Sequence, residues 1–210
     1  LWEYIGKKMP KKGRGTASGD YDPLSLPAEL QTALEALYGH YAKTFDLWQE
    51  KGIDVPPVFI VVCNNTSTSK LIYDFISGFV RKQDDGTESF NNGRLALLRN
   101  YDDYGNPLAR PNTLLIDSEQ LESGEALDKD FREMAGPELE QFRREIVARS
   151  GDIREGENLS DQAILREVMN TVGKKGRLGE PIRCVVSVSM LTEGWDANTV
   201  THILGVRAFG

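Results

Sequence analysis

Four residues between two apolar segments are the strongest candidates for chemistry in this chain. They are Glu193, Gly194, Trp195 and Asp196, and they lie in the stretch VSVSMLTEGWDANTVTHILGV, residues 186–206. Glycine lets a backbone approach a ligand closely, and a carboxylate accepts hydrogen bonds from ligand hydroxyls. A large apolar tryptophan favours packing in a core or between domains over stacking on a base. The stretch predicts a ligand-facing turn between two buried strands.

The common phosphate-binding loops do not occur in the sequence. Neither G-x-x-x-x-G-K-[ST] nor a G-x-G-x-x-G that follows a strand is present. The segment GKKGRLG, residues 173–179, has a different spacing and precedes a strand. Its Lys174 and Lys175 are nevertheless candidate contacts to the phosphate backbone of a nucleic acid. The alternative for this segment is a solvated surface loop.

No set of residues with catalytic spacing is visible. Asp117 ends an apolar run as a magnesium-binding carboxylate would, but without a phosphate loop a helix-capping or surface acid is the better interpretation. His40 and His202 have no evident partner, so both are interpreted as structural. Cys63 and Cys184 each lie in a β-branched run and predict two buried thiols in a reducing compartment. We predict neither a catalytic residue nor a metal site within this chain.

The elements that position these candidates alternate between apolar strands and helices. The strand runs lack polar alternation, which is typical of strands buried on both faces of a parallel sheet. The predicted fold class is therefore α/β, a three-layer αβα domain with a mainly parallel sheet and helices on both faces. A long helix precedes it, and a polar hairpin insertion lies at about residues 82–112. Strands are predicted at 56–63, 112–121, 182–191 and 199–206, and helices at 27–51, 70–80, about 125–135, 138–149 and 161–172, the last capped by Ser160 and ended by Gly173.

The composition is that of an ordinary soluble domain. The chain has 210 residues, of which 40% are hydrophobic and 27% charged, and no apolar run could span a bilayer. The net charge of −7 argues against attraction of nucleic acid to the whole surface, although a local basic groove remains compatible with it. Residues 1–26 are basic and rich in turn signals, which favours a solvated linker or arm over a nucleic-acid contact. No signal peptide is evident, so we expect a cytoplasmic protein without membrane contact.

The stretch around Gly194 resembles motif V of superfamily 2 helicases, in their second RecA-like domain. SVSMLTEGWD followed by THILGVRAFG is similar to the helicase subunit of type III restriction enzymes and their relatives. PVFIVVCNNTSTSK fits motif IV, the first strand and turn of the same domain. The likeness covers roughly residues 55–210, after the linker of 1–26 and a long amphipathic helix over 27–54 that packs on the domain.

The resemblance implies a role for each matched residue. In this family the positions of Gly194 and Asp196 face ATP in the cleft between two RecA-like domains, with Glu193 at the rim. ATP and magnesium would be bound together with a first RecA-like domain. The implied partners are double-stranded DNA, that first domain, a nuclease domain and a DNA methyltransferase (modification) subunit. Residues implied or proposed to contact nucleic acid are Asn64, Asn65, Thr66, Ser187, Ser189, Lys174 and Lys175.

The chain also departs from the family. It lacks a phosphate loop and a Walker B acid, and it ends before motif VI, whose arginine stabilises the transferring phosphate. Arg207 is not assigned that role. We therefore expect a fragment of a larger polypeptide, the second motor domain of a restriction-type DNA translocase or helicase, which hydrolyses no ATP alone. The alternatives are a stand-alone α/β binding or scaffolding domain and a small-molecule enzyme, and the missing catalytic pair disfavours the latter.

Overall fold

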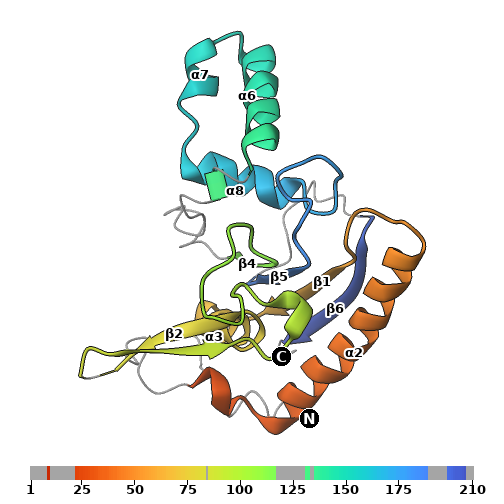
Figure 1. Cartoon of the computed structure of the whole chain (residues 1–210), viewed down its shortest axis with the longest axis vertical. Helices are drawn as coiled ribbons and strands as arrows, with labels where there is room; N and C mark the ends of the chain where they lie inside the picture. The colour runs from red at the N-terminus through yellow and green to blue at the C-terminus, as the bar shows by residue number, and fades with distance from the viewer. Residues whose placement is uncertain are drawn as a thin grey trace.

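The computed structural model describes most of the chain. It covers residues 22–83, 85–116, 135–188 and 198–206, together with Met9, Phe131 and Arg132. Within these residues it has an α/β architecture: a four-stranded parallel sheet lies between two layers of helices, as Figure 1 shows. The predicted fold class, a three-layer αβα domain of RecA-like type, is confirmed.

The sheet has the strand order β4-β5-β1-β6. All neighbouring pairs are parallel, so the carboxyl ends of the four strands share one edge of the sheet and the amino ends share the other. We call these the carboxyl edge and the amino edge. The strands are β1 (Val58–Cys63), β4 (Thr113–Ile116), β5 (Cys184–Ser187) and β6 (Val200–Val206).

Alternate residues of each central strand enter two separate cores. Phe59 and Val61 of β1 pack toward α2 (Ala28–Glu50) and α3 (Thr66–Ser77). Their neighbours Val58 and Ile60 pack toward the opposite layer. That layer contains α6 (Gly136–Ser150) and α8 (Asp161–Asn170), and the short helix α7 (Ile153–Glu157) packs against α6. Because both faces of β1, β4 and β5 are covered, these strands are largely apolar and their sequences show no alternation. Strand β6 is less covered, and its Ile203 is 65% exposed.

The long helix α2 confirms the predicted amphipathic segment. Leu30, Leu34 and Tyr41 from its apolar stripe are fully buried against the sheet. The Tyr41 hydroxyl donates a hydrogen bond to the Pro57 carbonyl at 2.9 Å. Part of the predicted linker also packs on the domain, because Met9 is buried in the same core as Leu30. Ahead of α2 lies the short 3-10 helix η1 (Pro23–Ser25).

The predicted hairpin insertion is present, with different boundaries. Strands β2 (Gly78–Lys82) and β3 (Glu88–Asn92) form an antiparallel ribbon beside the main sheet (Figure 1). The helix predicted over 70–80 is displaced toward the C-terminus, because α3 begins at Thr66 and ends at Ser77. Gly78 has a φ of 98°, a conformation open to glycine, and it turns the chain from helix to strand. After the ribbon come the 3-10 helix η2 (Ala96–Leu98) and a loop that leads into β4.

The layer formed by α6, α7 and α8 differs from the prediction at one end. Gly136 and Pro137 begin α6, since proline fits the first turn of a helix, and Phe131 and Arg132 before them are helical. The short helix α7 was not predicted. Helix α8 is confirmed, and the Ser160 hydroxyl caps it by accepting a hydrogen bond from the Ala163 N–H at 3.2 Å. Of the predicted helix at 125–135, only Phe131, Arg132 and Ala135 lie in the described residues.

Candidate functional site

Polar residues that were predicted to bind a ligand meet at the carboxyl edge of the sheet. Asn64, Asn65 and Thr66 directly follow β1 and lead into α3. Ser187 is the last residue of β5, where it lies between Val62 and Ile116 of the adjacent strands. These two segments are far apart in sequence, and the parallel pairing of β1 with β5 brings them together. Ligands of open α/β sheets bind at this edge.

The three residues after β1 have different environments. Asn64 and Thr66 are exposed, whereas Asn65 is buried. The Asn65 side chain is the N-cap of α3, because its Oδ1 accepts a hydrogen bond from the Thr68 N–H at 2.8 Å. Its Nδ2 donates to Asn64 Oδ1 at 3.0 Å. Asn65 therefore fixes the turn, and Asn64 and Thr66 present their polar groups to solvent.

The residues assigned to ATP lie outside the described part of the chain. These are Glu193, Gly194 and Asp196, and Ser189 of the predicted nucleic-acid contacts lies outside it as well. The same holds for Asp117 and Arg207.

The described residues on either side of 189–197 correct one aspect of the prediction. Ser187 lies at the carboxyl edge, but Asn198 and Thr199 lie at the amino edge, where the Thr199 carbonyl accepts a hydrogen bond from the Val58 N–H at 2.8 Å. Since β5 and β6 are parallel, the connection between them joins opposite edges. It is therefore a crossover and not a tight turn, and its second end does not lie beside Asn64.

Lys174 and Lys175 also lie away from the carboxyl edge. They are exposed and belong to the loop between α8 and β5, on the side of the sheet where β5 begins. Lys175 forms an ion pair with Asp54, which precedes β1. The structure thus does not bring the lysines together with Asn64, Thr66 and Ser187.

The amino edge is rich in paired charges. Arg110 donates to Glu138 Oε1 at 2.8 Å and to the Leu178 carbonyl at 3.1 Å. Burial by itself would raise the pKa of Glu138, but hydrogen bonding to Arg110 holds that pKa below its ordinary value. Arg177 joins Glu145 and Glu167, each at 2.6 Å. These charges hold the loops before β4 and β5 against the helices α6 and α8.

The two cysteines are buried, as the sequence predicted, and the two histidines have different environments. Cys63 and Cys184 are free thiols, both buried, and burial raises the pKa of Cys63 to about 12. Such thiols are unreactive. The His202 ring packs against Tyr41 and Phe59, with ring centroids 5.9 and 6.0 Å away. His40 is exposed on α2.

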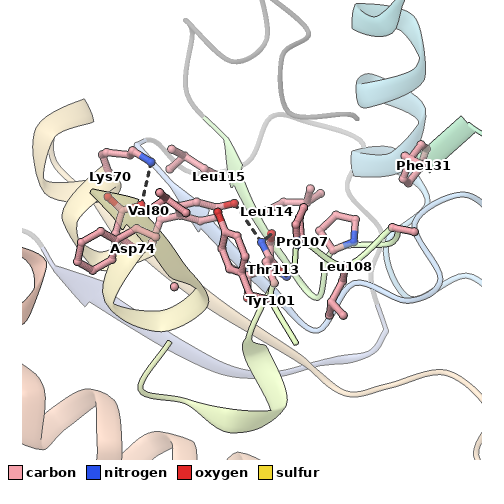
Figure 2. Close-up of a pocket in the computed structure, with 16 residues that line it drawn as sticks. Lys70, Asp74, Val80, Tyr101, Pro107, Leu108, Thr113, Leu114, Leu115 and Phe131 are labelled. Atoms are coloured by element: carbon pink, nitrogen blue, oxygen red, sulfur yellow. Dashed lines mark hydrogen bonds and ion pairs between the residues drawn. The ribbon is translucent and has the colours of Figure 1, made fainter. Parts of the chain in front are cut away.

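A pocket beside β4 contains residues that sequence reasoning did not assign to any site. It has a volume of about 520 Å³ and lies among α3, β2, the loop before β4 and β4 itself. Figure 2 shows Lys70 and Asp74 on one side of it and Pro107, Leu108 and Phe131 on the other. The lining residues come from five separate segments, and among them only Lys70 lies in a sequence that resembles a motif, so no local pattern could have identified the pocket.

Among the described residues, no group of histidine, cysteine and acidic side chains could hold a metal ion. None of the helices in that part of the chain has the length and apolar character needed to cross a membrane. Comparison of the chain with protein-family models, curated proteins and solved structures gave no match.

Proposed function

We propose that this chain is the second motor domain of an ATP-dependent DNA helicase or translocase of a restriction-modification system. One observation carries the proposal. The turn that resembles motif IV, Asn64–Thr66, and the strand that leads into the motif V-like sequence, ending at Ser187, converge on the carboxyl edge of a parallel three-layer domain. The resemblance implies nucleic-acid contacts for residues of both segments.

The described residues can supply contacts to a phosphate backbone. Asn64 and Thr66 are exposed and uncharged, so they can donate hydrogen bonds to phosphate oxygens without a specific base. Asn65 holds both in place through its cap on α3. In this proposal the carboxyl edge forms half of the track for double-stranded DNA. Lys174 and Lys175 lie at the opposite edge, away from this track.

ATP chemistry would be shared with another domain. When bound, ATP and magnesium would supply the energy for stepping along DNA, with hydrolysis chemistry from a first RecA-like domain and a motif VI arginine. Gly194 and Asp196 would face the nucleotide and Glu193 would lie at its rim. The further partners proposed are a nuclease domain and a modification methyltransferase, and the proposed location is the cytoplasm. This chain by itself is proposed to lack ATPase activity.

The test is DNA-stimulated ATP hydrolysis by a polypeptide that contains both RecA-like domains. Asp196→Ala is compared with Asp103→Ala, a matched change of an acid whose side chain is 93% exposed in the loop before β4. We expect Asp196→Ala to reduce the rate by about tenfold or more, the effect of losing a charged hydrogen bond of at least 1.4 kcal/mol. Asp103→Ala should leave the rate unchanged.

Two results would contradict the proposal. One is a folded two-domain polypeptide without DNA-dependent hydrolysis. The other is an Asp196→Ala variant that hydrolyses ATP as fast as the Asp103→Ala control. Either result would favour an α/β binding or scaffolding domain, in which Asp196 is a structural residue.

A further inference from the structure

The side of β4 that faces away from β5 is partly covered by a side chain whose amide makes hydrogen bonds as a neighbouring strand would. The Asn100 carboxamide accepts hydrogen bonds from the Thr113 N–H at 2.9 Å and donates to the Thr113 carbonyl at 2.8 Å. It also accepts from the Asn112 N–H and donates to the Tyr73 hydroxyl. This side of β4 therefore already binds a planar amide, which uses its N–H donor and its carbonyl acceptor at the same time.

Leu115 is the next residue of β4 whose N–H and C=O point away from β5. The Ile116 carbonyl accepts from Val188, and the Asn112 carbonyl accepts from Cys184, so even-numbered residues face β5. In a strand, alternate residues direct their N–H and C=O to opposite sides, so Thr113 and Leu115 face outward. Within the described part of the chain, no hydrogen bond engages the N–H or C=O of Leu115.

The space beside Leu115 is the 520 Å³ pocket of Figure 2, a size suited to a small molecule. Its lining combines apolar side chains with polar groups, and it includes the ring of Tyr101, which contacts Phe90 at a centroid distance of 5.2 Å. An aromatic ring next to a paired donor and acceptor favours a planar ligand with hydrogen-bonding groups along one edge.

The charged side chains in the described lining of the pocket neutralise each other. Lys70 and Asp74 are the charged residues there, and their ion pair spans 2.8 Å. The Asp74 side chain is 12% exposed, and burial raises its pKa. Lys70 also lies over the Tyr73 ring, 5.2 Å from its centroid. A charged ligand group would have no free partner among these residues, so an uncharged ligand fits better.

We propose that this pocket binds an uncharged nucleobase with a lactam edge, through the peptide N–H and C=O of Leu115. Guanine and thymine place a ring N–H beside a carbonyl, the same arrangement as the carboxamide of Asn100. Tyr101 provides an aromatic face for the base. A peptide that pairs with β4 as a further strand fits less well. Asn100 already occupies the N–H and C=O of Thr113, so one outward-facing residue of this four-residue strand remains. The inference goes beyond the motor function and does not depend on it.

Nucleoside binding to the 210-residue chain tests this inference. The probes are guanosine and thymidine, each compared by ligand-observed NMR with its N1-methyl or N3-methyl derivative, which lacks the ring N–H. We expect methylation to weaken binding by roughly tenfold, the value of one hydrogen bond to a peptide carbonyl. Tyr101→Ala should weaken guanosine binding by a similar factor. Tyr104→Ala is the matched control, because Tyr104 lies in the same loop, is 91% exposed and does not line the pocket.

A single-stranded oligonucleotide with one guanine, and the same oligonucleotide in a duplex, distinguish the two sources of the base. Binding of the single strand but not of the duplex would identify an unstacked base of a nucleic acid, whereas binding of the nucleoside alone would identify a free metabolite. The inference is overturned if neither nucleoside nor single strand binds, or if the methylated nucleosides bind as tightly. Should Tyr101→Ala fail to fold, the methylated probes on the unaltered chain still decide. Because no ATP is used, failure here is distinct from failure of the motor proposal.

Discussion

The two edges of the central sheet present opposite kinds of polar surface. At the amino edge, arginines and acids are joined to one another, as in Arg110 with Glu138 and Arg177 with Glu145 and Glu167. At the carboxyl edge, Asn64 and Thr66 are uncharged and exposed. Residues that neutralise each other hold loops in place, whereas exposed polar groups are available to a ligand. Because charges at the amino edge are paired, the basic loop at 173–179 is a weaker candidate for DNA binding than its composition suggests.

The largest effect on stability is expected from a change of Asn100, whose side chain binds the amino end of β4. Asn100→Ala would leave the buried N–H and C=O of Thr113 and the N–H of Asn112 without partners. We expect a loss of about 3 kcal/mol in the free energy of unfolding, measured by urea denaturation. Asn106→Ala, which removes an exposed hydrogen bond to Asp102, should change stability by less than about 0.5 kcal/mol. Equal effects of the two variants would show that the edge of β4 does not need the carboxamide.

A smaller effect is expected at the carboxyl edge. Asn65→Ala removes the cap of α3 and should lower the free energy of unfolding by about 1 kcal/mol. Its neighbour Asn64 is exposed, so Asn64→Ala should alter stability by no more than about 0.3 kcal/mol while it weakens DNA binding. If Asn64→Ala destabilised the chain as much as Asn65→Ala, Asn64 would be part of the turn and not a free contact.

The smallest effect on DNA binding is expected from the lysines of the amino edge. For a polypeptide with both motor domains, the slope of log affinity against log salt reports the number of phosphate contacts. Replacing Lys174 and Lys175 together by alanine should leave this slope unchanged, because the pair lies away from the carboxyl edge and Lys175 binds Asp54. A decrease in the slope by about two would show that both lysines contact phosphates and that the DNA also reaches the amino edge.

Local sequence was sufficient for most of the elements. The apolar run ending at Cys63 predicted a buried strand, and the stripe through Leu30, Leu34 and Tyr41 predicted α2, because periodicity reports directly which faces are buried. The run ending at Val206 predicted the strand β6, but β6 is only partly buried. The prediction was wrong at the end of α3, where two local signals disagree. The apolar Phe79 and Val80 extend the helical pattern of α3 past Ser77, although Gly78 was a signal for the helix end.

The fold class, the buried cysteines and the cap of α8 could be predicted from the sequence, since they depend on the pattern within segments and on the order of segments along the chain. Tertiary structure alone decided which segments meet. The order β4-β5-β1-β6 brings Ser187 beside the turn after β1, and it places Lys175 at the other edge. The pairing of Asn100 with Thr113 likewise depends on how the loop before β4 folds back. Contacts between distant segments are set by packing of the whole sheet, and no local pattern encodes them.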